Sequence, residues 1–186
     1  MLLQHPSLTG ITSLPNHHKR SLARVACLDQ HIPVDLYLGD AIYRPGCEDG
    51  HPLDPSSKAE FDSVLALDCA YHFNTRWTFL RQVHDQLRPG GSVALADICL
   101  ARETTWTRFI LLPVMPRENL VSTDEYLAHM QRIGYTDVRL EDITPHVFPG
   151  FISFLGKQGV VFRIFGSVMR LLAICGARFV IVRGCK

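Results

Sequence analysis

The stretch L-R-P-G-G-S-V-A-L-A-D at residues 87–97 decides the fold of this chain. Its second half, Ser92–Ala96, is a short apolar run, which is typical of a strand buried on both faces. The segment before it repeats apolar residues at helical spacing: Phe79, Leu80, Val83 and Leu87. The R-P-G-G turn therefore ends a helix and leads into a buried strand, the order from which sheets with covering helices are built.

The alternation of strands and helices continues on both sides of this stretch. Further strands are predicted at Leu8–Thr12, Val34–Leu38, Phe61–Leu67, Val138–Ile143 and Arg178–Val182. Pro15 suits the first turn of a helix after the first of these strands. The sequence S-T-D-E at residues 122–125 has the spacing of a capping box, and Gly134 ends the helix that it opens. We predict an α/β fold with a Rossmann-like sheet covered by helices on both faces.

Length and composition favour one globular domain over residues 1–186. The chain is 47% hydrophobic and 20% charged, as ordinary globular domains are. Its net charge of +1 lacks the excess of basic residues that nucleic-acid binders carry, so we expect a small-molecule substrate and no nucleic acid. The six cysteines form no C-x-x-C pair, so we expect reduced thiols and no metal site.

Two segments, the N-terminal start and a later apolar region, bear on localisation. The start, residues 1–6, lacks the basic flank and long apolar run of a signal peptide. The apolar region from Phe151 to Val182 is interrupted by basic residues at positions 157, 163, 170 and 178, so it contains no uncharged stretch of the ~20 residues that cross a bilayer. We expect a cytoplasmic protein in which this region is amphipathic cover and not a membrane contact, with attachment to a membrane surface as the alternative.

Polar residues follow four of the predicted strands where each strand ends. They are Thr12 and Ser13, then Asp40 and Ala41, then the stretch from Asp68 to His72, and finally Asp97. In open α/β sheets ligands bind at the carboxyl ends of the strands. The sequence therefore predicts one binding cleft at this edge of the sheet.

Each of these positions also has a purely structural interpretation. Asp40 is suited to accept a hydrogen bond from a nucleoside, or to form a turn after Gly39. Ser13 is suited to face a ribose, or to cap the following helix. His72 is a candidate general base, because the ordinary pKa of histidine lies near neutral pH. Alternatively, Tyr71 and His72 pack under the next helix, which Asn74 or Thr75 caps.

The motifs, taken in order, resemble those of class I S-adenosylmethionine-dependent methyltransferases that act on small molecules, akin to the tocopherol, sterol and cyclopropane-fatty-acid groups. They are G-I-T-S at 10–13, L-G-D-A at 38–41, D-x-x-x-H at 68–72 and L-R-P-G-G at 87–91, followed by A-D at 96–97. The resemblance is close over residues 8–100. It implies an antiparallel last strand and S-adenosylmethionine as cofactor.

The resemblance also assigns roles to residues. Thr12 and Ser13 would lie near the cofactor ribose, Asp40 and Ala41 near the adenine, and Asp68 near the methionine portion. Tyr71 and His72 would line the site of methyl transfer. Segments at about 102–121 and 148–175 would cover the acceptor, and their apolar composition indicates a hydrophobic one.

The sequence departs from the family at its start. Members carry a first strand that ends in an acidic residue, followed by a G-x-G loop beside the cofactor, and nothing before Leu8 supplies either. We therefore expect a chain that is truncated at its N-terminus, with weak cofactor binding and low stability. The alternative is a catalytically inactive, methyltransferase-like scaffold that pairs with another chain, or with itself, through an exposed sheet edge. A nicotinamide-dependent oxidoreductase would need G-x-G-x-x-G, which the sequence lacks.

Overall fold

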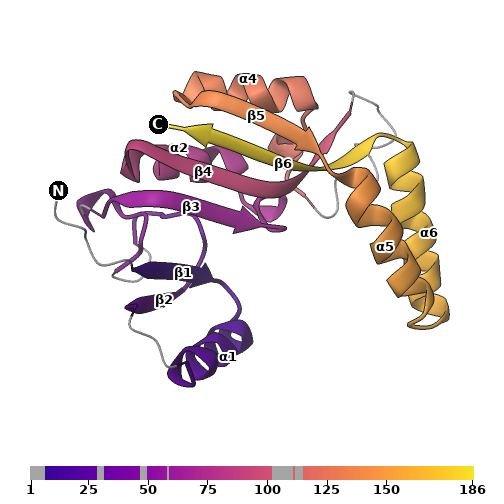
Figure 1. The fold of residues 1–186 in the computed structure, drawn as a ribbon, viewed down its shortest axis with the longest axis horizontal. Helices are drawn as coiled ribbons and strands as arrows, with labels where there is room; N and C mark the ends of the chain where they lie inside the picture. The colour runs from indigo at the N-terminus through magenta and orange to yellow at the C-terminus, as the bar shows by residue number, and fades with distance from the viewer. Residues whose placement is uncertain (1–6, 29–31, 47–49, 58, 102–110, 112–114) are drawn as a thin grey trace. The chain divides into compact units, whose positions relative to one another are not determined.

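The fold is described from a computed structural model of the chain. The structure describes residues 7–28, 32–46, 50–57, 59–101, 111 and 115–186 (Figure 1). It divides into two compact units, residues 1–59 and residues 60–186, and each unit is described by itself. The single domain expected over residues 1–186 therefore stays a prediction.

The first unit is a strand–helix–strand arrangement with a parallel pair of strands. Strand β1 (Leu8–Thr12) pairs with β2 (Val34–Leu38), so that Thr12 lies opposite Leu38. Helix α1 (Pro15–Ala26) connects the two strands, as Figure 1 shows. The bounds of these strands, and the start of the helix at a proline, confirm the predictions. A short 3-10 helix, η1 (Pro55–Ser57), follows in the predicted loop.

The second unit contains a four-stranded mixed sheet with the order β3-β4-β6-β5. Its strands are β3 (Phe61–Leu67), β4 (Leu87–Leu100), β5 (Thr136–Asp142) and β6 (Ala177–Cys185). Strand β4 is parallel to β3, and β6 runs antiparallel to both β4 and β5. The α/β class and the antiparallel last strand are confirmed.

Strand β4 is longer than the predicted Ser92–Ala96 at both ends. The R-P-G-G segment does not precede the strand but lies inside it, where the pairing with β3 shifts register between Phe61 and Ser63. Gly90 adopts a φ of +79°, which favours glycine, and a Cβ on Gly91 would lie 2.9 Å from the carbonyl oxygen of Arg88. The two glycines therefore allow a bulge within the strand.

Two helices pack together over the middle of this sheet. Helix α2 (Arg76–Gln86) begins at Thr75, whose Oγ1 accepts a hydrogen bond from the Thr78 amide at 3.2 Å. Helix α4 (Thr123–Ile133) begins with the predicted capping box. The Ser122 amide donates to the Glu125 carboxylate, and the Glu125 amide donates to the Ser122 hydroxyl oxygen. It ends at Gly134, at a φ of 119°. Both predicted helix starts are confirmed, with Thr75 and not Asn74 as the cap.

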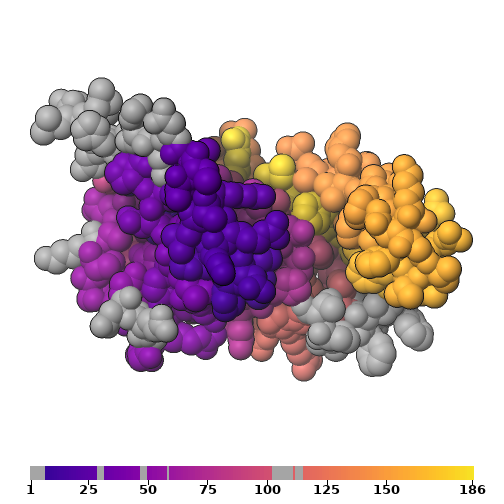
Figure 2. All heavy atoms as spheres, turned by 90° about the horizontal axis from the view of Figure 1, so that it is seen from below, coloured from indigo at the N-terminus to yellow at the C-terminus, as the bar shows by residue number. Residues whose placement is uncertain are grey.

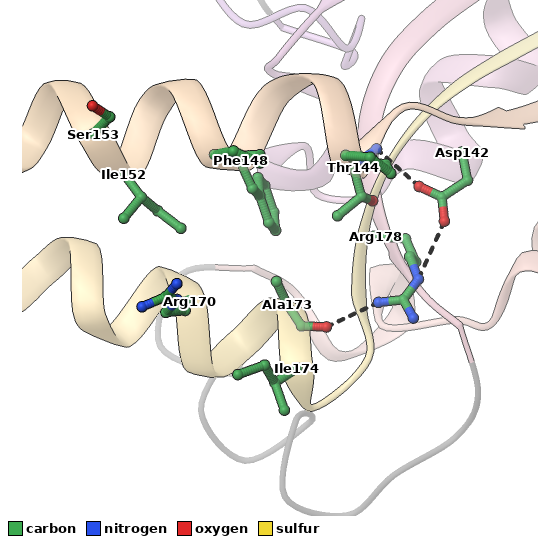
Figure 3. Close-up of a pocket in the computed structure, with 11 residues that line it drawn as sticks. Asp142, Thr144, Phe148, Ile152, Ser153, Arg170, Ala173, Ile174 and Arg178 are labelled. Carbon is green, nitrogen blue, oxygen red and sulfur yellow. Dashed lines mark hydrogen bonds and ion pairs between the residues drawn. The ribbon is translucent and has the colours of Figure 1, made fainter.

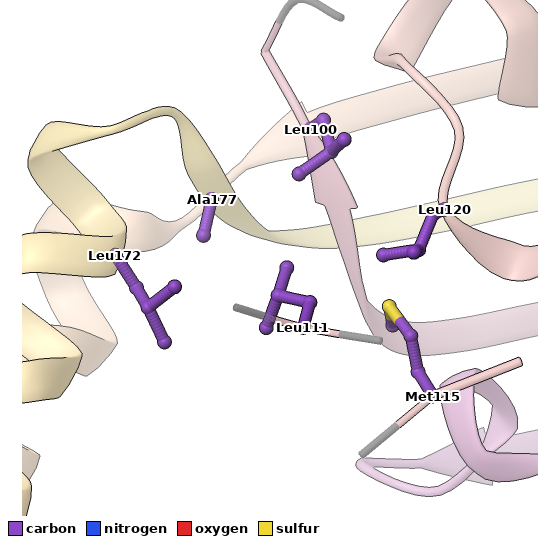
Figure 4. Packing of buried hydrophobic residues seen from close by; sticks show 6 residues of the cluster. All are labelled: Leu100, Leu111, Met115, Leu120, Leu172 and Ala177. Carbon is purple, nitrogen blue, oxygen red and sulfur yellow. The ribbon is translucent and has the colours of Figure 1, made fainter. Parts of the chain in front are cut away.

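Two further short helices, η2 (Ala70–His72) and η3 (Arg117–Asn119), lie near the ends of β3 and β4. A buried apolar cluster joins this end of the sheet to a later helix (Figure 4). Its members are Leu100, Leu111, Met115, Leu120, Leu172 and Ala177. Tyr71 of η2 packs against it.

Helices α5 (Thr144–Gly156) and α6 (Val160–Ile174) form a hairpin between β5 and β6. The two helices lie side by side and extend away from the end of the sheet (Figure 1). They occupy the predicted cover segment at 148–175, whereas most of the other one, at 102–121, lies outside the described residues. None of the described helices combines the length and apolar character needed to cross a bilayer.

Candidate functional site

The carboxyl ends of β1 and β2 bring the first two predicted positions together. The amide of Gly39 donates to the carbonyl oxygen of Thr12 at 2.9 Å, so the two strand ends are joined directly. Asp40 follows with one oxygen, Oδ1, accepting from the Ile42 amide at 3.1 Å. Its other oxygen, Oδ2, lies 3.9 Å from Nε of Arg44, and 56% of its side chain is exposed. Asp40 thus forms the expected turn and still presents a carboxylate oxygen outward.

His51 holds the loop after β2 in place, a role that the sequence did not indicate. Its Nδ1 accepts from the Leu53 amide at 2.9 Å, which leaves Nε2 to carry the proton and donate to the Asp40 carbonyl oxygen at 3.0 Å. The imidazole is buried and contacts the rings of Tyr37 and Tyr43 edge-on. This neutral histidine therefore fixes the backbone at Asp40.

The hypothesis that Ser13 caps α1 is wrong. The N-cap is Leu14, without a side-chain cap, and its amide donates instead to Oγ1 of Thr12 at 3.3 Å. Pro15 at the first helical position lacks an amide proton, so this helix start needs one partner fewer. Ser13 is exposed and Thr12 half-buried at the end of β1.

The end of β3 brings Asp68 and Tyr71 together. Asp68 has a φ of 54°, a left-handed conformation that few residues other than glycine, asparagine and aspartate adopt. Its amide donates to the Ala96 carbonyl oxygen at 2.8 Å, and Oδ1 accepts from the Tyr71 hydroxyl at 3.0 Å. Burial, followed by the charge of Asp68, raises the pKa of Tyr71. The phenol is therefore a neutral donor beside an exposed carboxylate.

The neighbours of Tyr71 differ in exposure. The ring of His72 lies 4.1 Å from that of Tyr71 and is exposed, so it does not pack under α2 as the alternative interpretation held. Cys69 is half-buried, and burial raises its pKa to about 11, so the thiol is protonated at neutral pH. Of the residues at this strand end, Asp68 and His72 are open to solvent.

A buried polar residue, Asn119, holds the backbone between Tyr71 and Arg76 in place. The side-chain amide of Asn119 donates to the backbone oxygens of Tyr71 at 3.0 Å and Phe73 at 2.7 Å. Its Oδ1 accepts from the Arg76 amide at 3.0 Å. Asn119 is fully buried, so it ties η2 to the start of α2 from a distant part of the chain.

Asp97 is not a strand-end ligand, which corrects its predicted place among the polar residues of the cleft. Strand β4 continues to Leu100, and the Asp97 carboxylate is fully buried. Its Oδ2 lies 2.7 Å from Nε of Arg76 and accepts from the Tyr126 hydroxyl at 2.7 Å. The Nε contact has ion-pair distance without hydrogen-bond geometry, while Arg76 Nη2 donates to the Ile98 carbonyl oxygen at 2.9 Å. The Asp97 carboxylate is therefore part of a buried polar network in the protein interior.

A largely apolar pocket of about 670 Å³ opens at the base of the helix hairpin (Figure 3). Phe148 and Ile152 of α5 and Ile174 of α6 line it. At its inner end, Nε of Arg178 pairs with Asp142 Oδ2 at 3.2 Å. Strands β3, β4 and β5 all end at this edge of the sheet, so the pocket and Asp68 lie on the same edge.

Comparison with known proteins points to a family for this chain. Residues 10–95, which run from β1 to β4, match the profile of a family described as "Methyltransferase domain". Together with the fold, this match supports a class I S-adenosylmethionine-dependent methyltransferase. It is 33% identical over 104 residues to 27-O-demethylrifamycin SV methyltransferase of Amycolatopsis mediterranei, which covers 52% of this chain and 37% of that protein. The match thus spans little more than a third of the length of that relative.

Solved structures show the same fold. One is phosphoethanolamine N-methyltransferase 2 of Haemonchus contortus, in complex with S-adenosyl-L-methionine. The superposition covers 98% of this chain and 49% of that protein chain, with a TM-score of 0.68 and 15% sequence identity. Another is mycolic acid cyclopropane synthase CmaA1, complexed with SAH and CTAB. The superposition covers 100% of this chain and 80% of that protein chain, with a TM-score of 0.71 and 14% sequence identity. These structures confirm the fold of the predicted family, and they were solved with S-adenosyl-L-methionine or SAH bound.

The structure brings the predicted site residues together in two groups. Thr12, Ser13, Asp40 and Ala41 lie at the end of the parallel pair in the first unit, and Asp68, Tyr71 and His72 lie at the end of β3 in the second. That both groups line one cleft stays a prediction. Sequence reasoning missed His51 and Asn119, whose partners are backbone atoms that no local pattern reveals.

Proposed function

We propose that this chain transfers the methyl group of S-adenosylmethionine to a small, apolar acceptor. The observation that carries the proposal is the recurrence of exposed carboxylates, Asp40 and Asp68, directly after parallel strands in a chain of this family. In such sheets the carboxyl ends of the strands are where ligands bind. The proposal includes weak cofactor affinity for these 186 residues, which contain no G-x-G sequence.

The residues of the two groups suit the cofactor chemically. Asp40 would hold the adenosine through Oδ2, since an ionised carboxylate accepts charge-assisted bonds from hydroxyl or amino groups. Thr12 and Ser13 would lie near the ribose, and Ala41 offers a small apolar surface to the adenine. Asp68 would face the positively charged methionine portion with its exposed carboxylate.

Tyr71 and His72 would line the site of transfer. When bound, the cofactor supplies an electrophilic methyl group on a sulfonium, so the main task of the protein is orientation, which is worth up to about 7–11 kcal/mol. Tyr71 keeps its proton and holds Asp68 through their hydrogen bond. His72 would accept the proton that an O–H or N–H acceptor releases, since its imidazole is exposed beside Tyr71.

The pocket below the hairpin supports an apolar acceptor. Its walls are mainly aliphatic and aromatic, and one ion pair, Arg178 with Asp142, offers a polar group at its inner end. Relatives named for small organic acceptors point the same way, such as erythromycin 3''-O-methyltransferase, at 25% identity. Structural neighbours include a geranyl diphosphate methyltransferase, at 14% identity and a TM-score of 0.66.

Isothermal titration with S-adenosylhomocysteine tests the proposed cofactor site. We expect heat at millimolar ligand for the wild-type chain and a dissociation constant raised roughly tenfold or more in Asp40→Asn, because a hydrogen bond to a charged group contributes about 1.5–3 kcal/mol. Asp35→Asn is the matched control, since Asp35 is an exposed aspartate of β2 and should bind as the wild type does. A wild-type chain that releases no heat at millimolar ligand would overturn the proposal.

The second candidate is a catalytically inactive scaffold that pairs with another chain. Among the described strands, β1 pairs only with β2, and β3 pairs only with β4, which leaves one edge of each strand without a partner strand. Leu65 and Leu67 on one face of β3 are 69% and 70% exposed, and such strands favour association. Size-exclusion chromatography with light scattering tests this, since a monomer at high concentration contradicts self-association.

A further inference from the structure

The helix hairpin leaves an unusual amount of apolar surface in solvent. We define the hairpin surface as the exposed apolar side chains of α5 and α6: Phe151, Phe154, Val160, Val161, Phe162, Ile164, Phe165, Val168, Leu171 and Ile174. Val161 and Ile174 are each 76% exposed. Side chains of the hairpin, coloured orange to yellow, reach the face of the molecule seen in Figure 2. Large exposed apolar surface is a recognised feature of interaction sites.

The residues of the hairpin surface are not the ones through which α6 packs within the fold. Helix α6 contacts α5 at the buried Gly166, where the carbonyl oxygen of Ile152 would lie 3.5 Å from an added Cβ. The base of α6 is held by Leu172 in the buried cluster of Figure 4. Helix α6 therefore packs against the rest of the second unit through the side that carries Gly166 and Leu172. Its exposed stripe, with Val161, Ile164, Phe165 and Val168 at i, i+3, i+4 and i+7, is a second apolar face.

The charged residues within the hairpin segment of the sequence all have one sign. From Ile143 to Lys186 the sequence contains no aspartate or glutamate. Within the hairpin, the basic residues Lys157, Arg163 and Arg170 are exposed. A second copy of this surface would bring like charges together, whereas an anionic surface would be attracted.

We propose that the α5–α6 hairpin binds the surface of an anionic lipid bilayer. The apolar side chains of the hairpin surface would enter the outer acyl region, and the three basic residues would contact anionic headgroups. Helix α6 has 15 residues, about 22 Å at 1.5 Å per residue, which is shorter than the ~30 Å hydrocarbon core, so the hairpin would lie in the interface without crossing it. This inference does not depend on the proposed methyl transfer, and it takes up the alternative of membrane-surface attachment that the sequence left open.

Vesicle flotation with the full chain tests the proposal. We expect the protein to float with vesicles of three parts phosphatidylcholine and one part phosphatidylglycerol, and to float much less with phosphatidylcholine alone. In the variant Val161→Ser/Ile164→Ser/Phe165→Ser, binding to the anionic vesicles should fall at least tenfold, because three side chains of the stripe lose their apolar character. Leu22→Ser is the control, since this leucine is 47% exposed on α1, outside the hairpin.

The basic residues are tested separately from the apolar ones. Arg163→Gln/Arg170→Gln should weaken binding to the anionic vesicles by roughly fivefold per charge, and 0.5 M salt should weaken wild-type binding in the same direction. Far-UV circular dichroism checks that every variant keeps the wild-type fold. Wild-type protein that stays with the soluble fraction, or a triple variant that floats as the wild type does, would overturn the proposal. Dimerisation that the triple variant abolishes, without flotation, would assign the surface to a second copy instead.

Discussion

The second unit contains two regions that depart from ordinary burial in opposite directions. Between α2, β4 and α4, the interior buries a charged pair, Arg76 and Asp97, whose side chains are 0% exposed. In the α5–α6 hairpin, large apolar side chains such as Phe154 and Ile164 remain 56% and 62% exposed. Folded proteins seldom bury charges without a partner, and buried charges or large exposed apolar patches are the informative exceptions.

The difference between these regions is whether the described chain supplies the groups that surround the unusual side chains. Around Asp97, the chain supplies an arginine, a tyrosine hydroxyl and the Ile98 amide, which donates to Oδ1 at 2.9 Å. The guanidinium of Arg76 also lies 4.5 Å from the ring centre of Tyr126, a cation–π contact. On the hairpin surface, by contrast, the described residues supply no cover. The first region therefore bears on stability, and the second is the surface that we propose binds a lipid bilayer.

The largest effect is expected from breaking the buried pair. Arg76→Ala leaves the Asp97 carboxylate buried beside Tyr126 without its countercharge, so we expect the free energy of unfolding to fall by about 3–5 kcal/mol. Urea denaturation followed by circular dichroism measures this loss. Arg81→Ala, at an exposed arginine five residues further along α2, is the control and should stay within about 0.5 kcal/mol of the wild type. If both variants unfold at the same urea concentration, the buried pair contributes nothing to stability.

A smaller effect is expected from removing one hydroxyl of the same network. Burial raises the pKa of Tyr126 well above its ordinary value, so the phenol stays protonated and donates to Asp97. Tyr126→Phe keeps the ring over Arg76 but removes this bond to a charged acceptor, which should cost about 1.5–3 kcal/mol. The same urea experiment measures it. A loss as large as that of Arg76→Ala would mean that the hydroxyl, and not the ion pair, holds the network together.

Much of the fold was predictable because it depends on local patterns. The strands Leu8–Thr12, Val34–Leu38 and Phe61–Leu67 have the predicted bounds, since each is a short apolar or alternating run between turn residues. The capping box at Ser122 was equally visible, because both of its partners lie within one helical turn. The extension of β4 to Leu100 was not predictable, since it depends on pairing with β6, which lies far along the chain.

The candidate site was predictable only in part for the same physical reason. Asp68 follows its strand directly and Asp40 follows its strand after Gly39, so sequence alone identified them as strand-end carboxylates. Asp97 has the same local pattern, but Arg76 and Tyr126 make it a core residue through contacts across 21 and 29 positions. Its predicted role failed because burial is decided by tertiary partners, which the spacing of one strand does not contain.

The smallest effect is expected from the hairpin surface, and it separates an interaction site from a folding core. Ile164→Ser should change the free energy of unfolding by no more than about 0.5 kcal/mol, because a side chain that is 62% exposed loses little apolar contact. Leu172→Ala on the same helix should cost about 2–5 kcal/mol, since Leu172 is 6% exposed within the buried cluster. Urea unfolding of both variants gives the comparison. Equal losses would mean that the stripe containing Ile164 is packed within the fold in solution, and a surface that the fold itself covers has no need of a lipid partner.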